Sequence, residues 1–441
     1  MILLPRTTFR RCGSILRILV ARNISTSHEP QECHPQQLKF LEEYKVRTML
    51  EQPIIYYSSK KLPQFSMEEL YLQLTRLSQH FILQNARDTI EHLLIYNCRR
   101  LKEFRKLPYL VVLNPSILES YDIYLQTMSS LLKASTYMPH TLDENTRFAE
   151  EVLTEFIDAH ADTLPSLSKG FTEVSSLMNT KKITDFLDQH LKERISMRLI
   201  AHQHIELTRT LNDPLKFVKG GKYNGVIKML HIPNIIKKNA VVVNDITMMK
   251  YNEAVEVAID TNLYPLNYWS QCEPELKEKS PEEMLNFPYI EYHLDYILME
   301  IFKNSFRAHI ENKITDPVQV TISTSYSPEK YLEIRVRDKG KGIPTTTLKH
   351  IFDYSFSTYE SGEGDSYKTL NVPPGLGGNT VAGMGFGLPL AKQYIEVFNE
   401  TIDKDKYGDD GGVGAAAMKG LLTVQTYPGW GTDVYVKTVG Y

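Results

Sequence analysis

The spacing of apolar residues changes near the middle of this 441-residue chain. Over residues 36–230, apolar side chains recur three and four positions apart, as in "MEELYLQLTRLSQHFILQNARDTIEHLLIYNCRRLKEFRKL", which contains no proline or glycine. Four long helical segments are predicted: Pro108 separates the first two, the third is interrupted near Pro165, and the fourth ends at the turn Asn212-Asp213-Pro214. Long helices with short connections predict an antiparallel four-helix bundle.

After a boundary between Asp213 and Asn239, strand-like runs alternate with glycine-rich loops. The predicted strands are "VQVTISTSYS", "YLEIRVRDKG", "LLTVQTYP" and "TDVYVKTV", and one more helix is predicted for "NDITMMKYNEAVEVAIDTN", with Asn244 and Asp245 as its possible N-caps. Residues 235–441 are therefore expected to form an α/β sandwich, with helices on one face of a mixed sheet. The acidic, glycine-rich stretch 399–419 is expected to be an exposed flexible insertion.

The N-terminus differs in composition from the rest of the chain. It carries five arginines, and its first acidic residue is Glu29. Serine, threonine and leucine lie among the arginines, which is typical of a mitochondrial transit peptide over residues 1–28. The alternative is a disordered basic tail.

Bulk composition excludes several other classes. The formal net charge is −3, so no excess of positive charge indicates a nucleic-acid partner. No apolar run approaches the ~18 residues that cross a bilayer. The four cysteines include no C-x-x-C pair, which argues against a disulfide framework or a zinc site and fits a reducing compartment.

Three polar motifs follow one another in the second half. Glu300, Asn304 and Arg307 repeat at the i, i+4, i+7 spacing of one helix face. "RVRDKGKGIP" then carries Asp338-x-Gly340-x-Gly342 at a strand end. Finally, "AGMGFGLPLAKQY" places Gly383, Gly385 and Gly387 before a helix that opens at Leu388.

Each motif has a mechanical reason to bind a nucleotide. A carboxylate at a strand end, followed by glycines, can accept a hydrogen bond from an adenine amino group. Glycines at a helix start let backbone N–H groups and the helix dipole reach a triphosphate. The Asn304 amide offers Mg²⁺ a neutral oxygen. One motif alone is weak, but the ordered three predict ATP binding. Neither a P-loop nor the H-R-D and D-F-G motifs of common protein kinases are present.

Together these motifs resemble the ATP site shared by DNA gyrase, heat-shock chaperones and bacterial histidine kinases. Within that superfamily, "LDYILMEIFKNSFRAHIE", "GMGFGLPLAKQY" and "GWGTDVYVK" resemble the mitochondrial 2-oxo acid dehydrogenase kinases, which phosphorylate serine in pyruvate or branched-chain dehydrogenase. "RLKEFRKLPYLVVLNPSI" and "FLDQHLKERISMRLIAHQH" extend the resemblance into the helical half.

The resemblance implies a role for each matching residue. Glu300 would deprotonate the serine hydroxyl, Asn304 would hold Mg²⁺ and Asp338 would bind adenine. The implied ATP contacts are Glu300, Ile301, Phe302, Lys303, Asn304, Ser305, Phe306, Arg307, Asp338, Gly340, Gly342, Ser357, Thr358, Gly383, Met384, Gly385, Phe386, Gly387, Leu388 and Thr432. Asp353 and the carbonyls of Ile351 and Phe356 match the potassium ligands of the family.

The resemblance further implies a mitochondrial-matrix enzyme that binds the lipoyl domains of the acyltransferase core. It also implies a homodimer, or a heterodimer with a related kinase, through the sheet-bearing domains. Pyruvate dehydrogenase is the first choice of substrate because it is the more widespread target, and the branched-chain complex is the second. The pyruvate kinases have a histidine four residues before the catalytic glutamate, where this chain has Tyr296, with His293 nearby. The chain also stops at Tyr441 without their C-terminal Asp-Trp tail.

Three other interpretations stay open. His202 and His204 in "AHQHIELTRT" would suit a histidine autokinase. A chaperone-type or repair ATPase would use ATP only to drive a clamp. The basic run "CRRLKEFRK" (98–106) is either the solvated face of a helix or a patch that docks on the acyltransferase core.

Overall fold

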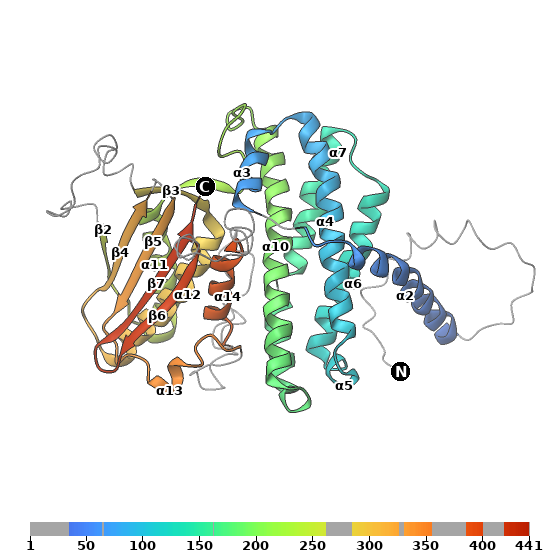
Figure 1. Ribbon diagram of the computed structural model, residues 1–441. Coiled ribbons are helices and arrows are strands. Elements are labelled where there is room, and N and C mark those ends of the chain that lie inside the picture. The colour runs from blue at the N-terminus through green and yellow to red at the C-terminus, as the bar shows by residue number, and fades with distance from the viewer. Residues whose placement is uncertain are drawn as a thin grey trace, which may run out of the picture.

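The computed structural model describes residues 35–63, 66–161, 163–261, 285–325, 330–354, 385–399 and 419–440. Within these ranges the chain forms a helical half and a sheet-bearing half that lie side by side (Figure 1). The predicted leader 1–28 and residues 400–418 of the predicted insertion lie outside the described residues. At the edges of that insertion, Asn399 exchanges two hydrogen bonds of 2.9 Å with the backbone of Gly420.

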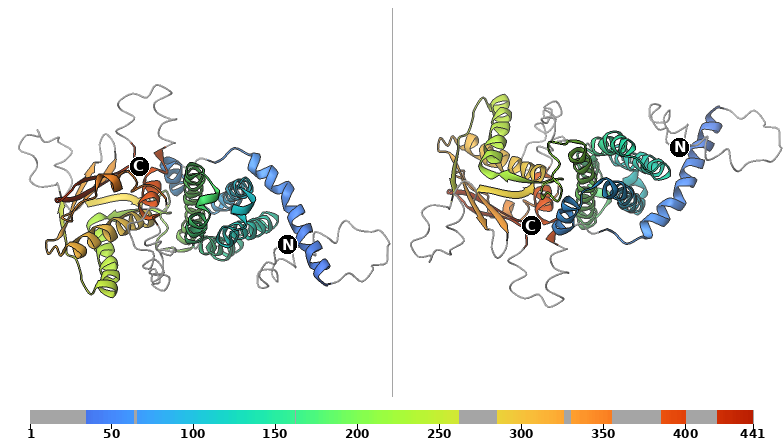
Figure 2. Two further views of the ribbon diagram at one scale, coloured as in Figure 1. Left: turned by 90° about the horizontal axis from the view of Figure 1, so that it is seen from below. Right: turned by 90° about the horizontal axis from the view of Figure 1, so that it is seen from above.

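The helical half confirms the predicted bundle. Its core consists of α4 (Gln79–Arg105), α6 (Pro115–Thr136), α10 (Thr180–Asn212) and a fourth rod made of α7 (Leu142–Arg147), the π-helical turn η1 (Phe148–Leu153) and α8 (Thr154–Ala159). Further helices pack around these four: α2 (Pro35–Ser59), α3 (Met67–Thr75), α5 (Tyr109–Val112), α9 (Thr163–Glu173) and the 3₁₀ turn η2 (Ser175–Leu177). Of these, α2 packs on α4 and projects beyond the bundle (Figure 2).

Side-chain caps mark the starts of three of these rods, and the cap at Ser78 falls inside the proline- and glycine-free stretch 67–107. Ser78 accepts a hydrogen bond from the Phe81 N–H at the start of α4, and Asn114 caps α6 next to the break at Pro108. Thr141 and Glu144 form a reciprocal capping box on α7. These side chains satisfy N–H groups that a helix start leaves without partners, so local sequence sets the beginnings of the rods.

The second half is the predicted mixed sheet with helices on one face. The strands are β2 (Val257–Thr261), β4 (Val318–Ser325), β5 (Tyr331–Asp338), β6 (Leu421–Tyr427) and β7 (Gly431–Val439), in the order β2-β4-β5-β7-β6. Among the paired strands of the described residues, β2–β4 alone is parallel. The covering helices are α11 (Ile232–Tyr251), α12 (Glu291–Asn312) and α14 (Gly387–Glu396), while β1 (Ile227–His231) and β3 (Asn286–Ile290) form a separate antiparallel pair.

Side-chain alternation explains which face the helices cover. On β5, Leu332, Ile334 and Val336 are fully buried, while the residues between them are partly exposed. The same alternation holds along β7. One face of the sheet therefore carries the core and the other stays open.

One predicted helix is wrong in its bounds. The helix expected to begin at Asn244 or Asp245 instead begins at Ile232, with a proline in its first turn, and it ends at Tyr251. Residues 257–261, expected to be helical, form the edge strand β2. Asn244 is not an N-cap: its amide donates to the Val255 carbonyl and accepts from the Val255 N–H, both at 2.9 Å, and so holds the chain as it turns into β2.

The two halves meet where α10 packs against α14. Asp188 of α10 accepts a hydrogen bond from Gln393 of α14 at 3.2 Å and another from the hydroxyl of Tyr354. Among the described helices, none has both the length and the apolar character that a membrane span requires.

Candidate active site

The polar face of α12 borders a cavity of about 710 Å³, within the usual range for small-molecule sites. Glu300, Lys303, Asn304 and Arg307 all line it. Phe302 and Phe306 point to the opposite side of α12, where both are fully buried and stack with ring centroids 5.5 Å apart. Helical periodicity therefore gives α12 one apolar face that packs in the core and one polar face that lines the cavity.

The Glu300 carboxylate is held from two sides. Its Oε1 forms an ion pair with the Lys303 ammonium group one turn along the helix. Its Oε2 lies against Gly387, the first residue of α14, so closely that a Cβ built there would stand 2.2 Å from Oε2. The positive end of the α14 dipole also favours a carboxylate at this position. A glycine is thus required where α14 begins, for the Glu300 side chain to lie where it does.

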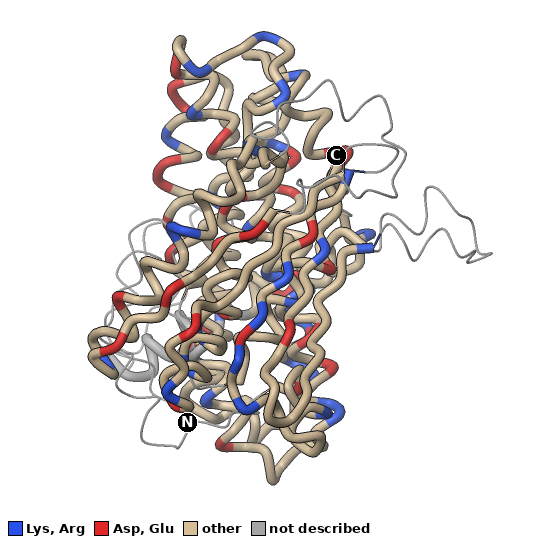
Figure 3. Tube along the Cα trace, turned by 90° about the vertical axis from the view of Figure 1, so that its left-hand side faces the viewer, with Lys and Arg blue, Asp and Glu red and all other residues tan. Residues whose placement is uncertain are grey.

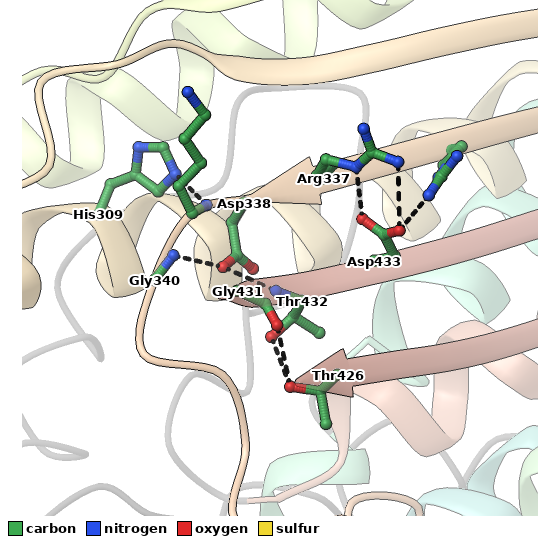
Figure 4. Close-up of polar contacts among 10 residues, drawn as sticks. His309, Arg337, Asp338, Gly340, Thr426, Gly431, Thr432 and Asp433 are labelled. Carbon is green, nitrogen blue, oxygen red and sulfur yellow. Dashed lines mark hydrogen bonds and ion pairs between the residues drawn. The ribbon is translucent and has the colours of Figure 1, made fainter. Parts of the chain in front are cut away.

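Asp338 ends β5 at another edge of the same cavity. Its Oδ1 accepts hydrogen bonds from the Gly340 N–H at 2.9 Å and the Thr432 N–H at 3.2 Å (Figure 4). Its Oδ2 receives no hydrogen bond from the described residues. Burial raises the pKa of Asp338 to about 6, although the two N–H donors act in the opposite direction. The carboxylate is thus fixed by one oxygen, and the other remains for a donor in the cavity.

The turn after Asp338 packs against the β6–β7 hairpin and is hydrogen-bonded to it. The Thr426 hydroxyl accepts from the Ile343 N–H at 2.7 Å and donates to the Gly431 carbonyl at 3.1 Å. Gly342 has φ +74°, and a Cβ there would stand 2.6 Å from the Tyr427 carbonyl oxygen. A glycine is therefore needed at this position both for its positive φ and because a side chain would clash with the Tyr427 carbonyl.

The structure brings most of the predicted contacts together. Those that line the cavity are Glu300, Ile301, Lys303, Asn304, Ser305, Arg307, Asp338, Gly342, Gly385, Gly387, Leu388 and Thr432. Four others do not: Phe302 and Phe306 lie in the core, Phe386 is buried against the Tyr354 ring, and Gly340 packs behind Asp338 on Ala308. Phe356, Ser357, Thr358, Gly383 and Met384 lie outside the described residues.

Sequence reasoning missed several residues that line the cavity. They are Ala308, Glu311, Asn312, Lys341, Ile343, Pro344, Thr347, Pro389, Val424 and Val434. Val434 lies two positions from Thr432 on β7, so strand alternation could have identified it. The pairing of Val424 with Val434 across β6 and β7 required the sheet order.

The residues predicted to hold potassium are partly described. Ile351 borders the cavity. The Asp353 carboxylate lies 2.6 Å from His350 Nδ1, and both side chains are more than half exposed. The third predicted ligand, Phe356, is among the residues that are not described.

Of the two histidines considered for an autokinase, His204 is buried in the helical half and His202 is half-buried. His204 is fully buried, with Nδ1 2.8 Å from Asn85 Oδ1 and Nε2 3.0 Å from Asn145 Oδ1. Burial lowers the pKa of His204 to about 3. His202 lies against the ring of Tyr292, with centroids 4.9 Å apart. Because both ring nitrogens of His204 are engaged in the core, this arrangement argues against its phosphorylation.

The basic run 98–106 is not a uniform surface patch. Arg100 is fully buried and forms an ion pair with Glu193 of α10. Arg105 pairs with Glu51 of α2 at 2.7 Å, while Lys102 is exposed. The run therefore serves in part to join three helices.

The fold and cavity define an ATP-binding domain, and the comparisons agree. Residues 290–439 match the family model of histidine kinase-, DNA gyrase B- and HSP90-like ATPases. Residues 64–228 match the model of mitochondrial branched-chain alpha-ketoacid dehydrogenase kinase. The chain belongs to the mitochondrial 2-oxo acid dehydrogenase kinase family, and it is an ATP-dependent protein kinase of that family.

Curated relatives span the chain. It is 32% identical over 437 residues to pyruvate dehydrogenase (acetyl-transferring) kinase 1, mitochondrial, of Saccharomyces cerevisiae, which covers 97% of each protein. It is 25% identical over 350 residues to isozyme 1 of that kinase from Mus musculus, covering 77% of this chain and 69% of the relative. The Arabidopsis thaliana kinase is 27% identical over 347 residues, covering 75% and 83%. All three carry "mitochondrial" in their names, in agreement with the arginine-rich N-terminus.

Proposed function

We propose that this chain phosphorylates a serine of the pyruvate dehydrogenase subunit in the mitochondrial matrix, using Mg²⁺–ATP, and thereby inactivates the complex. The single observation that carries this proposal is the convergence of Glu300, Asn304, Asp338 and Gly387 on one cavity. The end-to-end similarity to a yeast kinase of that name supports the choice of substrate.

The cavity contains the groups that phosphoryl transfer requires. Such transfer depends on alignment and charge neutralisation. Asn304 is exposed to the cavity and its amide makes no hydrogen bond within the described residues, so it would supply one oxygen to Mg²⁺. Lys303 and Arg307 would neutralise phosphate oxygens beside it. Glu300 would accept the proton of the serine hydroxyl, and Asp338 Oδ2 would accept from the adenine amino group.

Incubation with Mg²⁺–ATP and purified pyruvate or branched-chain dehydrogenase complex tests this proposal. We expect phosphoserine on the pyruvate dehydrogenase subunit, with loss of its activity. The Glu300→Gln variant should lose roughly 10²–10⁴-fold in transfer while it still binds ATP. Acid-labile phosphate on His204 would instead indicate an autokinase, and ATP turnover without a phosphoprotein would indicate a clamp ATPase.

The branched-chain dehydrogenase is the second candidate substrate. Tyr296 stands where the pyruvate kinases have histidine, and residues 64–228 match a model named for the branched-chain kinase. If this candidate is correct, the branched-chain complex is phosphorylated in the same assay and the pyruvate complex is not.

We also propose a dimer through the open face of the sheet. Figure 3 looks onto this face and shows positions of Lys and Arg (blue) interspersed with positions of Asp and Glu (red) along the strands. Asp433 of β7 pairs with Arg335 and Arg337 of β5, and Lys437 lies 3.6 Å from Glu333. An open face of mixed charge suits a two-fold contact with a second copy or a related kinase. Light scattering of the wild type and of Arg335→Glu tests this proposal, and a monomeric wild type would contradict it.

Two further ligands belong to this proposal. Potassium would bind near Ile351, Asp353 and Phe356, so activity should depend on K⁺ in preference to Na⁺. The kinase would also bind the lipoyl domains of the acyltransferase core. Co-sedimentation with isolated lipoyl domains tests that contact, and failure to sediment at any concentration used would contradict it.

A further inference from the structure

The turn that follows Asp338 sits directly on helix α12. Gly340 approaches Ala308 so closely that a Cβ at Gly340 would stand 2.9 Å from the Ala308 Cβ. One residue further along the helix, His309 reaches the same turn (Figure 4). Two neighbouring residues of α12 thus contact the turn, one by close packing and the other by a hydrogen bond.

The hydrogen bond joins the His309 ring to the backbone of the turn. The Lys339 N–H donates to His309 Nε2 at 3.0 Å, and the imidazole is fully buried. Lys339 stands between Asp338 and Gly340, whose N–H holds Asp338 Oδ1. The two residues that follow Asp338 are therefore both held through their backbone N–H groups, Lys339 by His309 and Gly340 by the Asp338 carboxylate.

The protonation state of His309 suits this role. To accept the Lys339 N–H, Nε2 must carry a lone pair, so the ring must be neutral with its proton on Nδ1. Burial lowers the pKa of His309 and favours the neutral ring, and the Lys339 ammonium acts in the same direction. The backbone and carboxylate of Asp316 oppose this effect, and Asp316 also pairs with the Lys339 ammonium at 2.9 Å.

We propose that His309 is a positioning residue for nucleotide selection: its Nε2 holds the Lys339 N–H, and this contact sets the direction of the Asp338 carboxylate toward the adenine amino group. The inference rests on the proposed role of Asp338 in binding ATP. It goes beyond that role because it assigns base discrimination to a residue that does not line the cavity.

Two variants of the full chain distinguish the effect of the His309 hydrogen bond from the effect of its side-chain volume. His309→Leu fills similar space but leaves the Lys339 N–H without an acceptor in the core. His309→Gln places a side-chain oxygen near the position of Nε2 and restores the acceptor. Calorimetric titration with Mg²⁺–ATP and with Mg²⁺–ITP gives the readout, because ITP carries a carbonyl in place of the adenine amino group.

We expect His309→Leu to bind ATP about tenfold more weakly, as for one lost buried hydrogen bond, and to bind ITP within about twofold of the wild type. The preference for ATP over ITP should therefore collapse, while His309→Gln keeps it within about threefold. In the kinase assay, the KM for ATP should rise in His309→Leu, and kcat at saturating ATP should change little.

Three results would overturn the inference. The first is an equal loss of ATP and ITP binding in His309→Leu, which would indicate general loosening. The second is a His309→Gln variant as weak as His309→Leu. The third is an unchanged preference in both variants. Failure of the wild type to bind ATP at all would instead contradict the proposed function, so the two failures are distinguishable.

Discussion

The Glu300 side chain and the Gly387 backbone fit closely against each other. The carboxylate occupies the space that any side chain on Gly387 would need. This contact joins α12 to the first turn of α14, so the position of the proposed base depends on a residue with no functional group. A sequence pattern shows both residues, but only the fold shows that they touch.

Substituting Gly387 by alanine should therefore displace Glu300. A Cβ would stand 2.2 Å from Oε2 and 3.0 Å from the carboxyl carbon, so the carboxylate must move. Because a displacement of about 1 Å can cost roughly 10²-fold, we expect a loss of that order in kcat, with a smaller change in ATP affinity. The measurement is steady-state phosphorylation together with nucleotide titration.

Gly220→Ala is the matched control, since nothing lies within 4 Å of its Cβ position. Its positive φ of +71° makes the substitution destabilising, but it should leave kcat unchanged. A Gly387→Ala enzyme with full kcat would show that Glu300 does not need its present position.

The ionisation of Asp338 should appear in the pH dependence of ATP binding. Burial raises the pKa of Asp338 to about 6, above the ordinary aspartate value of 3.8. The folded protein therefore holds this proton more tightly than the unfolded chain does. Protonation favours the fold below pH 3.8, and that contribution is lost as pH rises through about 6. ATP binding needs the opposite state, because a carboxylate is the stronger acceptor for the amino group.

We thus expect the ratio of ATP to ITP affinity to fall as pH drops through about 6. The phosphates of both nucleotides also titrate, and the ratio removes that common contribution. In Asp338→Asn the ratio should be low and independent of pH. A wild-type ratio that stays constant from pH 7.5 to 5, roughly the interval over which such a group changes charge, would contradict this assignment.

At the scale of elements, alternation and helical spacing predicted most of the fold. The runs that became β4, β5, β6 and β7 alternate clearly because one face of each packs on helices. The edge strand β2 was predicted as helix, and none of its residues is fully buried, so the contrast between its two faces is weaker than on the inner strands. Phe302 and Phe306 could have been excluded from the site by helical spacing alone, because they lie on the face opposite Asn304.

The interface between α4 and α10 encloses a buried ion pair. Arg100 and Glu193 are both almost completely buried, and Gln189 adds a hydrogen bond of 3.0 Å to Glu193. Arg100→Met would leave the carboxylate buried without its partner, and we expect a loss of roughly 3–5 kcal/mol in the free energy of unfolding. Chemical denaturation of the full chain measures this loss.

The double variant Arg100→Met with Glu193→Leu should recover most of that stability, because no buried charge remains. Lys102→Met, an exposed position on the same helix, should change it by less than about 0.5 kcal/mol. If the double variant were as unstable as Arg100→Met, packing rather than charge would account for the loss.

At the scale of the whole molecule, α10 belongs to both halves. It runs through the bundle core and packs against α14, which begins at the proposed phosphate end of the cavity. The Asp188 carboxylate accepts hydrogen bonds from the Tyr354 hydroxyl and the Gln393 amide. The rings of Tyr354 and Phe386 lie 5.2 Å apart and bracket the stretch 355–385 in the sequence. The contact between α10 and α14 therefore connects the bundle core to one wall of the nucleotide cavity.

Removing the Asp188 carboxylate should weaken the joint between the halves. In Asp188→Ala, Tyr354 and Gln393 lose their shared acceptor, so two hydrogen bonds no longer hold Tyr354 and α14 to α10. We expect a higher KM for ATP and, by scanning calorimetry, a single unfolding transition that broadens or splits, because the halves then unfold less cooperatively.

Tyr354→Phe should give a smaller effect in the same direction, since it removes one of the two hydrogen bonds. Asp185→Ala changes an exposed carboxylate on the same helix and should alter neither measurement. If Asp188→Ala kept one sharp transition and the wild-type KM, the two halves would be coupled through their other contacts and not through this carboxylate.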